Sequence, residues 1–288
     1  MSVFMRKSLR SCLAAVALAG CDLEFPEQDI VLRRDEAADT LDLLLVYRGV
    51  SADDDSEQAI EKGVAAAEKI LAGRRQFMFL DWPFHFDLDD AEIAADASPD
   101  ALRAVAGVSV ERVGAFLDAK GRLSGFQQLR LREASAWIEL VNGTVSRAVL
   151  EAEAAGTLGD DAPWLDARSR DLLVERARSG KPWVTLERNG IEIDVPVTAA
   201  AASGALRALS KENDVFSEAL VSLCRYLKVD AERTIARFGA PEPGGIVRFS
   251  LRRDDVTYSP ALRDALAERG SIEPGRLPSE SDVSRLVR

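Results

Sequence analysis

Hydrophobic residues recur along this 288-residue chain with two periods, one typical of strands and the other of helices. Every second residue is apolar from Leu41 to Tyr47, which predicts a strand over residues 41–50, and residues 29–34 are expected to form the strand before it. Apolar residues then recur at helical spacing from Ile60 to Leu71. We therefore expect a helix over Glu57–Leu71, capped by the polar loop 51–55.

Two further segments predict β-hairpins. Residues 109–117 and 123–131 flank the turn at Lys120-Gly121. A second hairpin is expected over residues 182–197, because Asn189-Gly190 suits a type I′ turn in which both residues adopt positive φ. That turn pairs Leu186 with Ile193. It puts apolar residues on one face (Val184, Leu186, Ile191, Ile193 and Val195) and polar residues on the other (Thr185, Glu187, Glu192 and Asp194).

The remaining segments predict how these hairpins are covered. Helices are expected over residues 133–155, 169–179, 199–209, 215–227, 230–238 and 260–269, strands over 76–80 and 246–252, and a loop over 240–245. This mixed order predicts an α+β fold of antiparallel hairpins covered by helices. We expect one domain over residues 29–270, with a subdivision near 156–168 left open, and a polar, partly disordered C-terminal tail over 271–288.

The first twenty residues differ from everything after them. Three basic residues, Arg6, Lys7 and Arg10, precede a short apolar run that ends in small residues. This arrangement is typical of a secretory signal peptide, and the run is too short to span a bilayer. Leu18-Ala19-Gly20-Cys21 resembles the lipobox of bacterial lipoproteins.

The lipobox resemblance covers residues 1–21 and implies an address and an anchor. The Cys21 thiol would carry a diacylglyceryl group, and a peptidase would cut between Gly20 and Cys21. Residues 21–28 would then form a short lipidated tether that joins the domain to the bilayer. Two alternatives remain open: ordinary secretion after the A-x-A motif Ala17-Leu18-Ala19, and a core helix that merely looks like a signal.

Charge and cysteine content narrow the partners. Residues 1–20 contain three basic and no acidic residues, so their removal lowers the formal charge from −11 to −14. Such a surface repels phosphate backbones, and we expect no nucleic-acid partner. It also repels anionic headgroups, so the lipid bilayer would be reached through acylated Cys21, while protein partners are unknown. Cys224 is expected to be a buried small hydrophobe at the end of a helix.

The richest local cluster is residues 81–90. It contains the only histidine, His85, together with Asp81, Asp87 and two further aspartates. His85 could act as a general base oriented by a carboxylate. The simpler interpretation is that Phe84 and Phe86 pack inward while His85 and Asp87 face solvent. No G-x-S-x-G elbow accompanies the histidine.

Other motifs add little chemistry. Asp53-Asp54-Asp55 lacks the rest of an EF-hand loop and is expected to be a solvated loop. The phosphate-binding patterns G-x-x-x-x-G-K and G-x-G-x-x-G are absent from the sequence, so we expect no cofactor and no metal. Two hypotheses follow. The first is an exported, membrane-anchored envelope lipoprotein that serves as a binding, assembly or scaffold module. The second is a tethered hydrolase or metal-dependent enzyme that uses His85 and nearby carboxylates.

Overall fold

A computed structural model gives the fold and describes residues 22–74, 76–78, 85–87, 99–160, 162–187, 190–211, 224–238, 240–242, 246–253 and 256–285. The chain forms two compact units. Among the described residues, unit 1 contains those within 99–104 and 133–247, and unit 2 contains those within 22–87, 105–132 and 248–285. The fold is α+β, as the sequence predicts. The predicted domain limits stay a prediction, and residues 156–168 lie within unit 1.

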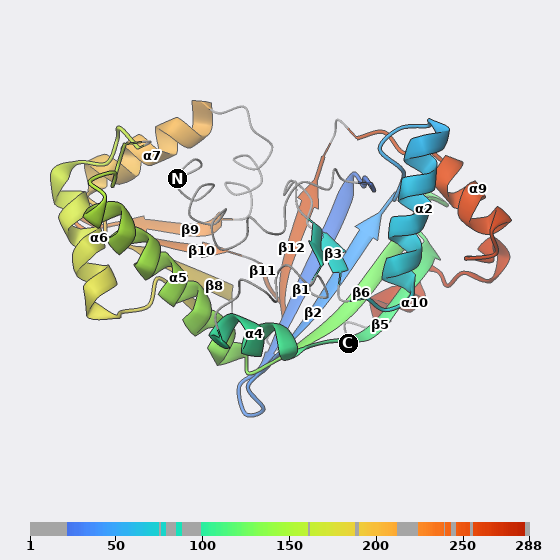
Figure 1. Ribbon diagram of the computed structural model, residues 1–288, viewed down its shortest axis with the longest axis horizontal. Coiled ribbons are helices and arrows are strands. Elements are labelled where there is room, and N and C mark those ends of the chain that lie inside the picture. Colours follow the sequence, from blue (N-terminus) through green and yellow to red (C-terminus); the bar gives the residue numbers. More distant parts are fainter. Residues whose placement is uncertain are drawn as a thin grey trace. The chain divides into compact units, whose positions relative to one another are not determined.

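Unit 2 is built on antiparallel strands that follow the predicted hairpins closely. Four strands form its centre: β1 (Glu27–Asp35), β2 (Thr40–Arg48), β5 (Val108–Leu117) and β6 (Leu123–Arg132). Strand β12 (Ile246–Arg252), of which residues 248–252 belong to unit 2, lies next to β1 and extends the sheet to the order β12-β1-β2-β6-β5 (Figure 1). Both faces of β2 are buried, since Leu44 and Val46 are as inaccessible as Leu43 and Leu45.

Helices cover this sheet at the predicted positions. Helix α2 (Glu57–Leu71) begins after Ser56, whose hydroxyl accepts a hydrogen bond from the Ala59 N–H at 3.2 Å. It packs against α9 (Ala261–Glu268), which buries Leu262 and Leu266 completely. In α2 the predicted apolar stripe supplies the buried residues Val64 and Ala67.

The stretch after Gly270 is more structured than expected. Residues Pro274–Arg276 form a 3₁₀ turn and Glu280–Ser284 form α10. Ile272 and Val283 are buried, and Leu117 of β5 forms a bridge with Ser279. Residues 271–285 thus contain two buried apolar side chains, and the partial disorder expected for 271–288 stays a prediction.

Unit 1 contains the second sheet and three long helices. The helices are α5 (Ala134–Ala154), α6 (Ala167–Ser179) and α7 (Ala199–Lys211), and the sheet has the order β7-β8-β10-β9. Helix α5 runs unbroken through Asn142-Gly143. The Asn142 side-chain oxygen accepts hydrogen bonds from the N–H groups of Trp183 and Val184, both at 2.8 Å. This asparagine therefore fixes the start of β7 to the helix.

The hairpin of β7 (Val184–Glu187) and β8 (Gly190–Val195) exists, but its predicted register is wrong. Leu186 pairs with Ile191, not with Ile193, and Glu187 pairs with Gly190. The shift is two residues, so the apolar side chains stay on one face. Gly190 has φ +147° and begins β8. Gly190 is therefore not the second residue of a type I′ turn, because that residue needs a φ near the left-handed helical value.

The helix predicted over 230–238 is wrong, and so is the described part, residues 224–227, of the helix predicted over 215–227. Residues Cys224–Val229 form strand β9 and Thr234–Phe238 form strand β10, which pairs with β8. Residues 215–223 lie outside the described residues. The apolar residues of both segments fit the helical period as well as the strand period. The strand forms because pairing satisfies the backbone N–H and C=O groups at the edge of β8.

Shorter elements complete the fold. Strands β3 (Gln76–Met78) and β4 (His85–Asp87) pair in a small separate sheet, which confirms the first part of the strand predicted over 76–80. Helix α4 (Pro99–Ala106) was not predicted, although Ser98-Pro99 is a helix-start signal. Residues 240–242 of the expected loop form strand β11 instead.

Candidate functional site

The residues after the predicted lipid site are packed against unit 2. Cys21 lies outside the described residues. Leu23 and Phe25 are buried at 4% and 5% exposure, and the Phe25 ring meets Tyr47 edge-on with centroids 5.0 Å apart. Glu24 exchanges two backbone hydrogen bonds with Ser51, of 2.9 and 2.8 Å. The tether was expected over residues 21–28. From Leu23 onward these residues are part of the folded unit and do not form a free spacer.

The histidine cluster is only partly described. His85 and Asp87 lie in β4, opposite Met78 and Gln76 of β3. Asp81 and the helix expected after Asp90 lie outside the described residues. The hypothesis of a site formed by Asp81, His85 and Asp87 stays a prediction.

The acidic loop ahead of α2 is exposed, as predicted for Asp53-Asp54-Asp55. Asp54 accepts a hydrogen bond from the Ser56 N–H at 2.6 Å, and the Ser56 hydroxyl and N–H together lower the pKa of its carboxyl. Asp55 accepts a bond from the Ser259 hydroxyl. Across the part of the chain that the structure describes, no three histidine, cysteine or acidic residues gather closely enough to hold a metal ion.

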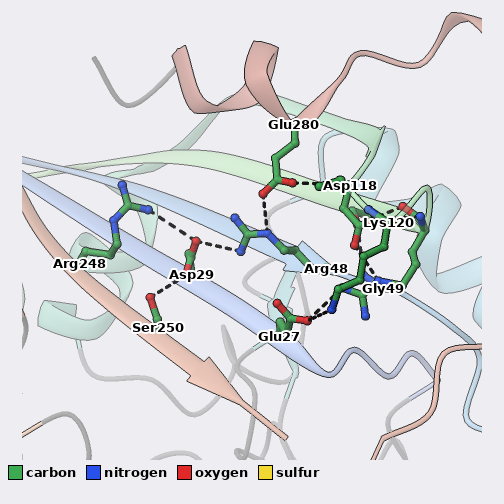
Figure 2. Close-up of polar contacts among 12 residues, drawn as sticks. Glu27, Asp29, Arg48, Gly49, Asp118, Lys120, Arg248, Ser250 and Glu280 are labelled. Carbon is green, nitrogen blue, oxygen red and sulfur yellow. Dashed lines mark hydrogen bonds and ion pairs between the residues drawn. The ribbon is translucent and has the colours of Figure 1, made fainter. Parts of the chain in front are cut away.

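The densest polar arrangement lies where α10 covers the sheet of unit 2 (Figure 2). Its centre is Arg48, at the end of β2. The Arg48 guanidinium donates to Asp29 of β1 at 2.8 Å and to Glu280 of α10 at 2.9 Å. Asp29 also accepts a bond from the Ser250 hydroxyl at 2.7 Å and faces Arg248 at 3.5 Å. We call these five residues the α10 cluster.

A second group of charges continues the α10 cluster along the β5–β6 turn. Arg122 donates to Asp118 at 2.7 Å and to Glu27 at 3.0 Å, and Lys120 reaches Glu27 at 3.2 Å. The second oxygen of Glu280 accepts from the Ala119 N–H at 3.0 Å. Glu280 therefore ties α10 to both β2 and this turn.

Local charges set the ionisation of these groups. Burial by itself would lower the pKa of Arg48, but the Asp29 and Glu280 carboxylates outweigh it and raise that pKa above its ordinary value. Burial would likewise raise the pKa of Glu27, but hydrogen bonds from Arg122 and Lys120 hold it below its ordinary value. Both groups are thus fixed in their charged forms at neutral pH.

The cavity beside the α10 cluster is small. It measures about 40 Å³ and lies between Asp29, Arg48, Arg248 and Glu280, with Phe116 and Val283 closing it. This volume admits water but no organic substrate, since one water needs roughly 10–15 Å³ by this measure. The charged side chains of the cluster are engaged with one another. The arrangement can therefore hold α10 in place, and it offers no poised proton donor or acceptor.

Unit 1 also contains a buried charged residue, on the face of the 182–197 hairpin that was predicted to be polar. Asp194 of β8 is 8% exposed and accepts hydrogen bonds from Arg176 of α6 at 2.7 Å and Arg233 at 2.8 Å. Burial raises its pKa, but these two arginines outweigh that effect and lower it. Arg176 also lies 5.9 Å from the centre of the Trp183 ring. A wide groove of about 560 Å³ lies nearby on the surface of α5 and α6.

Sequence reasoning missed both charged clusters. Asp29, Arg48 and Asp194 lie in strands that carry other charged residues, such as Glu192 beside Asp194, so the sequence held no signal that singled them out. Their partners Glu280 and Arg176 lie far away in sequence or on another element, so no local spacing connects them. Cys224, expected to be buried in a helix, is half-buried at the start of β9.

Comparison of the chain with protein-family models, with curated proteins and with solved structures found no significant match. Among the described residues, none of the helices combines the length and the apolar character that crossing a bilayer would require. By its fold the chain is an α+β protein with two larger antiparallel sheets.

Proposed function

We propose that this protein is an exported bacterial lipoprotein, anchored to a cell membrane on its periplasmic or extracellular face through acyl chains on Cys21. The observation that carries the proposal is the sequence itself: three basic residues and a short apolar run precede Leu18-Ala19-Gly20-Cys21. The lipobox-like motif ends at Cys21, and Leu23 and Phe25 are already buried side chains of unit 2.

We further propose that the mature chain is a binding, assembly or scaffold module. The side chains of the α10 cluster neutralise one another around a cavity too small for a substrate, which favours a structural role for these charges. The formal charge of −14 after removal of residues 1–20 disfavours a nucleic-acid partner. The proposed partner is the lipid bilayer, reached through the acyl chains on Cys21. The alternative of a hydrolase or metal-dependent enzyme at His85 rests on the sequence pattern alone.

Replacing Cys21 with Ser tests the anchor, because the serine hydroxyl cannot form the thioether. We expect the wild type to partition into a detergent phase and to incorporate a fatty-acid probe. The Cys21→Ser variant should do neither, since acyl chains supply roughly 0.8 kcal/mol per buried CH₂ and nothing replaces them.

The matched control is Cys224→Ser, which removes a thiol of the folded part and should keep the lipid. Mass spectrometry of the mature N-terminus decides the outcome. A diacylglyceryl cysteine at position 21 supports the proposal. An unmodified chain that begins at Gly20 would establish ordinary secretion and overturn it.

A further inference from the structure

The first described residues, from Asp22 to Phe25, lie against unit 2. Consecutive Cα atoms are about 3.8 Å apart, so Cys21 lies within that distance of Asp22. The Asp22 carbonyl oxygen would lie only 3.1 Å from a Cβ atom at Gly63 of α2. The chain is thus held against the α2 surface up to the residue next to the proposed lipid site.

The same end of unit 2 gathers several connecting segments. The bonds between Glu24 and Ser51 bring the loop before α2 beside the N-terminal segment. The bond from Ser259 to Asp55 brings the start of α9 to that loop. Asp53, Asp54, Ser56 and Gln58 are exposed there. We call residues 51–58 the α2 entry loop.

The opposite end of unit 2 is the turn between β1 and β2. Strand β1 follows residues 22–26 directly and extends over nine residues, from Glu27 to Asp35. At roughly 3.3 Å per residue, the strand carries the chain about 25 Å away. Figure 1 shows the turn over residues 36–39 as the blue loop at the lower ends of β1 and β2, with Glu36, Ala37 and Ala38 exposed.

We propose that unit 2 has a defined membrane-facing end, the α2 entry loop, which rests against lipid headgroups while the β1–β2 turn points away from the bilayer. This inference rests on the proposed lipidation of Cys21. It follows because a lipid attached to a chain with no free spacer holds the nearest surface at the headgroups, whereas a flexible tether would let the unit rotate.

The chemistry of this end specifies the lipid. Asp22, Asp53, Asp54, Asp55 and Glu57 give it a marked excess of carboxylates. Anionic headgroups would repel it over a distance set by the ionic strength, about 10 Å at 0.1 M salt. The surface that it fits is therefore zwitterionic, such as phosphatidylethanolamine, with contact weakened by anionic lipid at low salt.

Site-specific fluorescence quenching tests the orientation. The purified, acylated protein carries Cys224→Ser, so that an introduced cysteine is the reactive thiol, and either Asp53→Cys or Ala38→Cys. Each is labelled with a fluorophore and placed in phosphatidylethanolamine–phosphatidylcholine vesicles that contain a headgroup nitroxide. We expect loss of emission from the label at position 53 and retention of emission from the label at position 38.

A spacer variant is the matched control. Ten Gly and Ser residues inserted between Asp22 and Leu23 preserve the lipobox-like motif but add a flexible reach of roughly 16–19 Å. The difference between the two labels should then shrink. Replacing a third of the lipid with phosphatidylglycerol at low salt should restore emission at position 53, and added salt should remove it again.

The outcomes separate the two proposals. If mass spectrometry finds no acyl group on Cys21, the proposed function fails, and the orientation fails with it. If the chain is acylated but the label at position 38 is quenched as strongly as the label at 53, or neither label is quenched, the orientation alone is overturned. Equal contrast with and without the inserted spacer would also overturn it.

Discussion

At Gly190 of unit 1 both the backbone conformation and the space around it disfavour a side chain. Its φ of +147° lies in a region that L-residues rarely adopt. A Cβ atom there would lie 2.6 Å from the carbonyl oxygen of Phe238, in the neighbouring strand β10. That oxygen belongs to the backbone, so it can move only if the pairing of β8 with β10 moves with it.

The expected cost of Gly190→Ala has two parts. Holding alanine in a glycine-only region costs about 1–3 kcal/mol. Forcing the two strands apart adds about 1–3 kcal/mol, as other overpacking substitutions do. The free energy of unfolding should therefore fall by about 2 kcal/mol or more, a large share of the 5–15 kcal/mol typical of a domain. With a urea m-value of about 1–3 kcal/mol/M, the midpoint falls by roughly 1 M or more.

Two other glycines of unit 1 provide controls. Gly180 ends α6 with φ +68° and has open space where its Cβ would lie, so Gly180→Ala should cost only the conformational strain of about 1–2 kcal/mol. Gly143 is exposed within α5, also with open space, and Gly143→Ala should stabilise the unit by about 0.5–1 kcal/mol.

The assay is urea unfolding followed by tryptophan fluorescence, because Trp137, Trp164 and Trp183 all lie in unit 1. The three midpoints should rank in the order Gly143→Ala, Gly180→Ala, Gly190→Ala, from highest to lowest. A Gly190→Ala midpoint at or above that of Gly180→Ala would refute the close approach of Phe238 to β8.

Three further substitutions probe the charged clusters and the histidine. Asp194→Asn should lower stability by about 1.5–3 kcal/mol at neutral pH. Because folding lowers the pKa of this carboxyl, its contribution is complete above the unfolded value of 3.8 and is lost as the pH falls below it, so melting curves that stay separate at low pH would contradict the assignment. Glu280→Ala should cost about 1.5–3 kcal/mol in urea unfolding and speed proteolysis of the C-terminal segment, because Arg48 and α10 lose their link. The exposed Glu273→Ala is its control, and equal proteolysis of both variants would dismiss the link. His85→Ala should change the melting temperature little and abolish no function, and an activity that vanishes in this variant at unchanged stability would replace the scaffold proposal with the enzyme alternative.

Local pattern alone determined much of this protein. The limits of α2 follow from apolar spacing within Glu57–Leu71, and the strands of unit 2 follow from alternation, because both signals depend on neighbours within a few residues. The α+β class follows from the order of these elements. The proposed lipid site at Cys21 is local in the same sense, since a peptidase would read the four residues of the motif and not the fold.

Tertiary structure decided what local pattern leaves degenerate. The sequence of residues 224–238 is compatible with a helix or with strands. In the folded chain β10 pairs with β8, and β9 pairs with β10, so both segments are strands. Gly190 lies against the Phe238 carbonyl of β10, a contact that no local pattern records.

The buried charges are decided in the same way. Asp194 looks like a solvent-facing residue in its strand, and it is buried because Arg176 of α6 and Arg233 reach it. Glu280 and Arg48 are 232 residues apart, and only folding brings them within 2.9 Å. A charged side chain is buried only where an oppositely charged partner lies beside it, and the sequence does not show where that partner lies in the fold.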